Sequence, residues 1–581
     1  MSMEFSELVA APRELSKLCR PIASRDGKFI ATVSKATVLP ANGAVPQFKL
    51  VIRSSRSLMI KKQLQLPPGF IPKIVKWYQS AAVGLSVDES SEQQLDDEVH
   101  RIFAANDDGE VRIWDLDSMS DGVTNGIDDL KSVIVIRQVN WGPNVSIKNV
   151  EWGRSPDEIL VFSDYQVALA VWSLVEKESV EIYHPKYYTA KGFSFQPGTR
   201  HLAVLTRPVS EDTISLYGGP LSELETLSTF GLSDFYDAKG FKWSPDGRWI
   251  AVYDTITNFQ VGIYTPSGGL YRVFAMHDIG LGVHGIEWST GGNLLAVASY
   301  DGVVRCLNTL TFTPTVILRH SASINTKERI VFVEQPVKGK EGRAKYQRAQ
   351  NYPVSPPKLL SSLTDAPPKT GFSIVKFNKD GTLLATRFDL IPTTLWVWSL
   401  RSMTVLAVLV HVRKIKSVEW HPQKSHLLLI TCANSQSKDD EVYENYDLAD
   451  VGNDNDCCVY IWNAEWRNPY ALRVPRVGSA FASVTHATWI RLEAEVDDSG
   501  DEQTLDDDSK LALRAKALLC DRGSFTVGYL DDDQEPEDDD TKVQRLIDGV
   551  QQQEWAELTT TSYIEDTFAM VDQRRTAIKA V

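Results

Sequence analysis

The chain has 581 residues, of which 43% are hydrophobic, so it can bury one large core or several small ones. Its formal net charge of −15 argues against a nucleic-acid clamp, which usually presents a basic face, and against strong direct docking on another acidic surface. No stretch approaches the roughly 18 apolar residues of a membrane span, and the N-terminal MSMEFSELVAAPRELSK does not resemble a signal peptide.

One pattern recurs along the chain: a short alternating segment, a turn rich in Pro, Asp and Gly, and an apolar run. In chain order the copies are IASRDGKFIATVS from Ile22, VKWYQSAAVGLSV from Val75, VEWGRSPDEILVFSD from Val150, FSFQPGTRHLAVLT from Phe193, FKWSPDGRWIAVYD from Phe241, IEWSTGGNLLAVASYDG from Ile286, VKFNKDGTLLATRFD from Val375, VEWHPQKSHLLLIT from Val418 and ATWIRLEAE from Ala487. An aromatic landmark marks all but the first, where Ile22 takes the equivalent place: Trp77, Trp152, Phe195, Trp243, Trp288, Phe377, Trp420 and Trp489.

The closest landmarks are about 43 to 48 residues apart, which is the period of a four-stranded propeller blade. In the fifth copy, Pro245 fixes φ and Asp246-Gly247 supplies the positive-φ corner of a turn. The apolar run after the turn is typical of a strand covered on both faces, and a third strand such as NDDGEVRIWDL, ending at Leu116, follows. The sequence therefore predicts an all-β, WD40-like β-propeller.

Nine copies favour one ring of nine four-stranded blades within residues 1–531, and the alternative is seven or eight blades plus a distorted repeat, since the second and ninth copies are weak. A lone sheet cannot cover its own apolar faces, and ring closure removes exposed edges. The FSELV segment near the start is a candidate to pair into the last blade. Inserted loops are expected at about 88–99, 117–131, 334–370, 434–456 and 493–508.

The sequence offers little catalytic chemistry. Its ten histidines are scattered, without a Cys or carboxylate at a metal-ligand spacing, and its six cysteines form no spaced framework, as expected in a reducing compartment. GLGVHG, residues 280–285, has the glycine spacing of a dinucleotide site, but it precedes a blade strand instead of opening a helix. We expect no enzyme activity, metal, cofactor or small-molecule substrate.

The segment from about 334 to 370 is the one basic island on the chain. It holds Ser355 in VSPP, a candidate for proline-directed phosphorylation, and its candidate partner-binding residues are Lys338, Lys340, Arg343 and Lys345. The alternative is a solvated loop with no partner.

Residues 532–581 read as an acidic linker followed by a short amphipathic helix. Val543, Leu546, Ile547 and Val550 follow helical spacing, and Trp555 extends the same apolar face. Such a segment either folds back on the ring or docks on a partner.

The order of several segments resembles the WD-repeat-containing protein eight family. These segments include VEWGRSPDEIL, HPKYYTAKGFSFQPGTRHLAVLTRP, LGVHGIEWSTGGNLLAVASYDGVVRCLN and IPTTLWVWSL, and the most specific stretches are Gly240 to Asn325 and Gly371 to Pro422. The resemblance covers roughly residues 5–530. One departure is that Trp-Asp at the end of a third strand survives only at Trp114-Asp115, so the His–Asp tetrad of regular WD repeats is expected to be mostly missing.

The resemblance implies a non-catalytic scaffold of the cytoplasm and cytoskeleton, at the spindle pole body or centrosome. Its implied partners are a coiled-coil microtubule-anchoring protein and a minus-end-directed kinesin of the fourteenth class, with microtubules bound only indirectly. No nucleic acid or membrane partner is expected. The alternatives are a translation-initiation-factor-like propeller that binds the ribosome and a generic protein-interaction scaffold.

Overall fold

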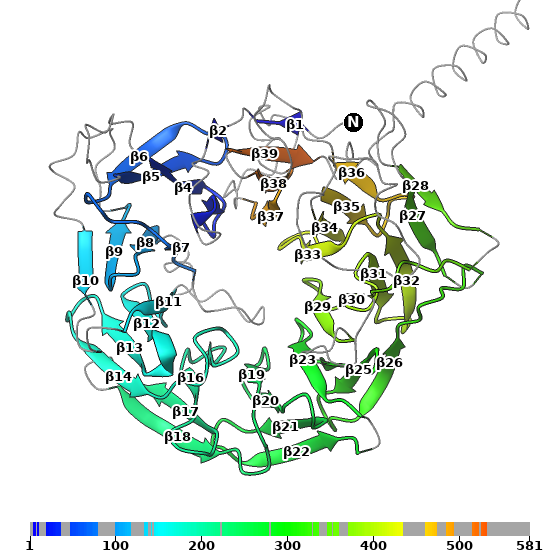
Figure 1. The fold of residues 1–581 in the computed structure, drawn as a ribbon, viewed down its shortest axis with the longest axis horizontal. Helices are drawn as coiled ribbons and strands as arrows, with labels where there is room; N and C mark the ends of the chain where they lie inside the picture. The colour runs from blue at the N-terminus through cyan, green and yellow to red at the C-terminus, as the bar shows by residue number, and fades with distance from the viewer. Residues whose placement is uncertain are drawn as a thin grey trace, which may run out of the picture. The chain divides into compact units, whose positions relative to one another are not determined.

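The computed structural model describes residues 4–6, 9–10, 19–35, 47–79, 99–117, 133–137, 141, 145–220, 224–277, 280–327, 329–335, 345–350, 353–359, 370–433, 459–472, 484–492, 514–521 and 524–530. All of them belong to one compact unit, Glu4–Leu530. Within it, nine β-sheets are arranged as the blades of a ring, each with one strand near the centre and one at the rim (Figure 1). The fold is an all-β propeller of nine blades, and the alternative of seven or eight is wrong.

Blades 1 to 5 are antiparallel and four-stranded, with the strands in chain order from the centre outward. They comprise β3 (Ile22–Ala23), β4 (Phe29–Lys35), β5 (Phe48–Ser54) and β6 (Ile60–Gln65); β7 (Ile74–Trp77), β8 (Arg101–Ala105), β9 (Glu110–Asp115) and β10 (Val133–Arg137); β11 (Ile147–Trp152), β12 (Glu158–Ser163), β13 (Ala168–Ser173) and β14 (Ser179–Tyr183); β15 (Phe193–Phe195), β16 (Leu202–Thr206), β17 (Thr213–Gly218) and β18 (Glu225–Gly231); and β19 (Gly240–Trp243), β20 (Ile250–Tyr253), β21 (Gln260–Tyr264) and β22 (Leu270–Ala275). A 3-10 turn, η3 (Asp164–Gln166), joins β12 to β13.

Blades 6 to 9 complete the ring. They contain β23 (Val283–Trp288), β24 (Leu294–Ser299), β25 (Val303–Asn308) and β26 (Pro314–Arg319); β29 (Phe372–Phe377), β30 (Leu383–Phe388), β31 (Thr394–Ser399) and β32 (Thr404–Val410); β33 (Ile415–Trp420), β34 (Leu427–Cys432), β35 (Val459–Asn463) and β36 (Tyr470–Leu472); and β37 (His486–Ile490), β38 (Ala515–Cys520), β39 (Ser524–Leu530), β1 (Glu4–Phe5) and β2 (Val9–Ala10). No helix in the described part of the chain is long and apolar enough to cross a membrane.

The first strands of the chain close the ring by pairing with its last strand. In β1, Glu4 pairs with Tyr529 and Phe5 with Gly528 on β39. Farther along β39, Val9 of β2 pairs with Phe525. Phe5, Ser6 and Val9 of the FSELV segment therefore join the final blade, as the sequence suggested.

A side-chain oxygen fixes the turn that recurs after the inner strands. Ser244 Oγ accepts a hydrogen bond from the Trp249 backbone N–H at 2.9 Å, and Gly247 supplies the corner with φ +69°, a conformation that favours glycine. The same acceptor bond recurs in three other blades, from Phe29 to Ser24, from Leu294 to Ser289 and from Leu383 to Asn378. The repeated Ser-Pro-Asp-Gly-like sequence therefore encodes one local conformation.

Five of the tryptophan landmarks join their blade to the one before it. Trp288 Nε1 in blade 6 donates a hydrogen bond to the Lys242 carbonyl of blade 5 at 3.2 Å, and Lys242 directly precedes the landmark of blade 5. The other bonds of this kind run from Trp77 to Ile22, Trp152 to Lys76, Trp420 to Lys376 and Trp489 to Glu419. The bond to Ile22 shows that the landmark position in blade 1 belongs to Ala23, one residue later than the sequence analysis placed it.

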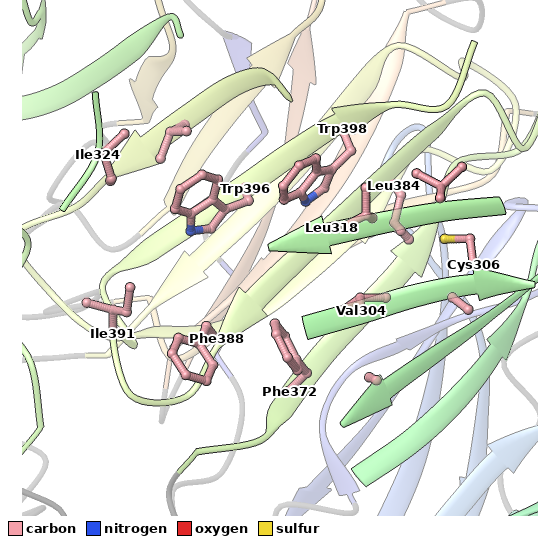
Figure 2. Close-up of a cluster of buried hydrophobic side chains, with 14 of the residues drawn as sticks. Val304, Cys306, Leu318, Ile324, Phe372, Leu384, Phe388, Ile391, Trp396 and Trp398 are labelled. Carbon is pink, nitrogen blue, oxygen red and sulfur yellow. The ribbon is translucent and has the colours of Figure 1, made fainter. Parts of the chain in front are cut away.

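Apolar side chains from neighbouring blades form the cores. Between blades 6 and 7, Cys306 and Leu318 pack with Leu384 and with the stacked rings of Trp396 and Trp398 (Figure 2). The ring centroids of the two tryptophans lie 5.7 Å apart, with 14° between their planes. Each sheet thus gains its buried surface from its neighbours, which is the expected basis of propeller stability.

Blade 7 carries two additional strands, so part of the segment expected to be a loop is regular structure. β27 (Val331–Gln335) runs parallel to β32 on its outer side, and β28 (Lys345–Arg348) pairs antiparallel with β27. The sheet becomes six-stranded. The other predicted loops, and the tail, lie almost wholly outside the described residues.

Part of the WD tetrad survives in blade 7. His320 Nε2 lies 2.7 Å from Thr386 Oγ1, and Trp398 Nε1 donates to the same oxygen at 2.8 Å. His320 is half-buried against the rings of Phe372 and Trp396, and burial lowers its pKa to about 3, so the imidazole is neutral in the folded chain.

The landmark bond can be measured with a matched pair of variants. Trp288→Phe removes an N–H that bonds to Lys242, whereas Trp243→Phe removes a buried N–H with no partner in the described structure. Because the two changes remove the same ring volume, we expect Trp288→Phe to lower the free energy of unfolding by about 1 kcal/mol more. Urea unfolding of both variants measures this, and equal losses would contradict it.

His320 should also make stability fall in acid. Its pKa is lower in the folded chain than in the unfolded one, so below pH 6.5 the unfolded chain takes up a proton that the folded chain does not. Between pH 7.5 and pH 5 the wild type should lose about 2 kcal/mol more unfolding free energy than His320→Gln. Urea unfolding at both pH values checks this; identical losses would show that His320 titrates normally.

Candidate partner-binding surface

The charged side chains of the inner strands pair with one another across blade boundaries. Lys76 Nζ lies 2.6 Å from Glu151 Oε1, and Lys242 pairs in the same way with Glu287. The pair Lys76–Glu151 lines a cavity of about 470 Å³ between the inner strands of blades 1 to 4. Among the described residues, no group of three His, Cys, Asp or Glu side chains could hold a metal ion. The two ion pairs each join the inner strands of neighbouring blades.

One face of the ring carries both the connections between blades and the turns between each second and third strand, because antiparallel strands alternate in direction. We call this the upper face. On blades 3 to 5 it is formed by the residues around Tyr165, Lys186, Val209 and Tyr236. Loops held on a rigid scaffold are where binding residues concentrate.

A buried ionic network fixes the loops of this face. Lys186, only 7% exposed, donates hydrogen bonds to Asp212 Oδ2 and Asp237 Oδ1, each at 2.7 Å. Arg207 donates to both oxygens of Asp212, at 2.7 and 2.8 Å. Two connections between blades and one turn are thereby tied together, and the buried Lys186 and the half-buried Arg207 share the two carboxylates.

Asp254 and Lys239 extend the network toward blade 5. Asp254 accepts backbone N–H bonds from Tyr236 and Asp237, and Lys239 pairs with Asp237. Although burial works to raise the pKa of Asp237, its bonds to Lys186 and Lys239 lower that pKa to about 2. The network thus contains three cations and three carboxylates, so its formal charges cancel. The cations are Lys186, Arg207 and Lys239, and the carboxylates are Asp212, Asp237 and Asp254.

Exposed aromatic and apolar side chains stand on this framework. We call them the tyrosine surface: Tyr165, Tyr183, Tyr188, Val209 and Tyr236. Tyr165 is 80% exposed, Tyr236 81% and Val209 90%. Exposed aromatic and apolar groups on the loops of a rigid scaffold are candidates for protein interaction.

One cation lies between two parts of the tyrosine surface. Lys148 Nζ lies 5.7 Å from the ring centroid of Tyr188 and 3.7 Å from Asp164 Oδ1, next to Tyr165. Tyr165 has a φ of 56°, which is strained for a residue with a side chain. The arrangement offers aromatic faces to a partner.

The predicted site residues fall elsewhere or outside the described residues. Lys345 is exposed on β28 at the rim of blade 7, and Ser355 is exposed nearby in the chain. Lys338, Lys340 and Arg343 lie outside the described residues, as do all of the tail residues, Val543, Leu546, Ile547, Val550 and Trp555.

A buried polar cluster attaches the strand pair that bears Lys345. Glu334 of β27 accepts hydrogen bonds from Tyr460 Oη at 2.7 Å and from the Val412 N–H at 2.8 Å. Tyr346 Oη of β28 lies 2.7 Å from His411 Nδ1, and burial lowers the pKa of His411 to about 3. The base of the basic segment is thus fixed to blades 7 and 8.

Sequence reasoning missed the tyrosine surface, although a signal was present. The stretches SDYQV, HPKYYT and SDFYDAKG each follow a strand end where the chain turns onto the upper face. Strand order places all three on one face, where Tyr165 and Tyr236 are exposed although Phe235, next to Tyr236, is buried in the core.

Comparison with known proteins agrees with the architecture. Residues 268–308 match the family described as WD domain, G-beta repeat. The matched segment runs from the outer strand of blade 5 through the third strand of blade 6, which is one repeat of the ring. The ring is a WD40-type propeller.

Two relatives are distant. The chain is 29% identical over 299 residues to WD repeat-containing protein WRAP73 of Mus musculus, across 48% of this chain and 64% of that protein, less than two thirds of its length. It is 25% identical over 393 residues to an uncharacterized WD repeat-containing protein of Schizosaccharomyces pombe, across 67% of this chain and 73% of that protein.

Solved structures are similar at the level of coarse shape. The C-terminal WD40 domain of Sif2 gives 11% identity and a TM-score of 0.40, over 82% of this chain and 100% of that one. A eukaryotic initiation factor gives 10% identity and a TM-score of 0.43, over 79% of this chain and 91% of that one. At these TM-scores neither likeness carries an argument.

The buried network predicts unequal effects of two lysine substitutions. Lys186→Met leaves Asp212 and Asp237 without their enclosed cation, so we expect a loss of about 3 kcal/mol in unfolding free energy. Lys239→Met removes a side chain that is 40% exposed, and the loss should stay below about 1 kcal/mol. Urea unfolding compares them. Equal effects would mean that Lys186 is not an essential part of the network.

Proposed function

We propose that the chain is a non-catalytic WD-repeat scaffold of the spindle pole body or centrosome. With a coiled-coil anchoring protein and a minus-end-directed kinesin of the fourteenth class, it anchors microtubule minus ends and supports spindle organisation. The observation that carries the proposal is the ordered resemblance to the WD-repeat-containing protein eight family. Its most specific stretches, Gly240 to Asn325 and Gly371 to Pro422, lie in blades 5 to 8.

The chemistry of the ring is consistent with a scaffold. Inner-strand charges such as Lys76 and Glu151 pair with each other, and exposed aromatic side chains such as Tyr165 and Tyr236 stand on the upper face of blades 3 to 5. The net charge of −15 disfavours direct attachment to the acidic microtubule wall. Partners on the loops would then connect the ring to the microtubule.

A second candidate is a propeller that binds the ribosome, because some translation initiation factors also have nine blades. That role needs a basic surface toward RNA, and the basic segment around Lys345 is the one place where the sequence offers it.

Imaging and fractionation separate the two functions. A fluorescently tagged full chain should concentrate at spindle poles in mitotic cells and stay out of the ribosomal fractions of a sucrose gradient. Diffuse mitotic fluorescence together with ribosomal co-migration would overturn the spindle-pole proposal.

Microtubule binding should need an adaptor. The purified full chain should remain in the supernatant when microtubules are pelleted at physiological salt, because acidic surfaces repel. A basic microtubule-binding protein in a parallel tube controls for polymer integrity. Strong pelleting of the chain alone would contradict indirect binding.

A further inference from the structure

We propose that the tyrosine surface on blades 3 to 5 binds a basic, arginine-containing segment of a partner polypeptide. The inference rests on the proposed scaffold role and adds the chemistry of one partner. In this mode, guanidinium groups lie over the exposed tyrosine rings and pair with carboxylates beside them.

The framework already holds cations over aromatic rings. Lys148 Nζ lies 5.7 Å from the ring centroid of Tyr188, and Lys186 Nζ lies 5.7 Å from that of Tyr187. Tyr165 and Tyr236 are more exposed and hold no cation of the described chain over their rings. Rings of this kind attract arginine through the quadrupole of the π-system, and tyrosine is enriched among residues that dominate binding energy.

The charges beside the rings favour a cationic occupant. The buried network is internally neutral, so it leaves the outer carboxylates to set the local charge. Glu211 and Asp234 are exposed and carry no ion pair to a described residue. Lys191 is exposed on the same face and offsets one of them, and the ion pair of Lys148 with Asp164 is neutral. The net local charge is negative, which selects basic partners and speeds their encounter.

The surface needs little rearrangement to bind. Backbone bonds to Asp254 hold the connection that bears Tyr236, and Lys186 ties this connection to the turn after β16. Preorganised loops lose less conformational entropy on binding. Arginine is favoured over lysine because its planar guanidinium stacks on aromatic faces and is more weakly hydrated.

The basic segment of the same chain is a poor occupant. Its described end, Lys345, is on β28 at the rim of blade 7, across the ring from blades 3 and 4 (Figure 1). A separate polypeptide therefore fits better. A second copy of the chain is the competing occupant, and it would reveal itself as concentration-dependent self-association.

The test measures binding of a fluorescein-labelled peptide of repeating Arg-Leu-Gly triplets to the purified full chain by fluorescence anisotropy. The Tyr165→Ala/Tyr236→Ala variant should bind roughly tenfold more weakly than wild type. Tyr271→Ala, which removes an exposed tyrosine from the outer strand β22, is the matched control and should bind like wild type. A peptide with Lys in place of Arg should bind several-fold more weakly. A peptide with Glu in place of Arg should show no measurable binding.

A charge pair separates this surface from the general acidity of the chain. Glu211→Lys/Asp234→Lys should weaken binding roughly tenfold. Glu176→Lys/Glu178→Lys makes the same change in net charge on the opposite face and should have little effect. Circular dichroism confirms that each variant is folded.

Any of three results would overturn the inference. They are no peptide binding by the wild type, equal losses in the surface variants and their controls, and self-association of the chain that the Tyr165→Ala/Tyr236→Ala variant abolishes. None of them bears on where the tagged chain resides in mitotic cells, so failure here and failure of the spindle-pole proposal are distinguishable.

Discussion

Every sheet of this ring has two apolar faces that only a neighbouring sheet can cover, and the rest of the structure depends on that constraint. The inner tryptophans set how the sheets meet. Each donor, as in the bond from Trp288 to Lys242, reaches the residue just before the landmark of the preceding blade. The same offset recurs at five junctions, so successive sheets are placed by a repeated bond as well as by packing.

Much of this architecture could be predicted from the sequence, because repetition amplifies a weak local signal. The turn around Gly247 is encoded by a few residues, and nine approximate copies of it identify the fold. The error at Ile22 arose where the aromatic landmark is replaced by Ala23, since no side chain there marks the register. The parallel strand β27 was missed because its pairing with β32 connects segments that no local pattern relates.

The candidate site was harder to predict than the fold. Sequence reasoning searched for charge runs and amphipathic tails, and so selected residues such as Lys345. The tyrosine surface depends instead on which turns share a face, which becomes visible only once strand order is known. Its supporting network is non-local as well, because Lys186 meets Asp212 and Asp237 from different connections.

The closure of the ring also constrains how the protein is made. Ser6 bonds to Thr526, a separation of 520 residues, so a ribosome must synthesise nearly the whole ring before β1 can meet β39. Throughout that interval the opening residues lack their pairing partner and the first blade lacks one neighbour. Premature termination before Ser524 would leave an open ring with unpaired strand edges and exposed apolar surface. Nascent chains should therefore depend on chaperones until the last blade has been translated.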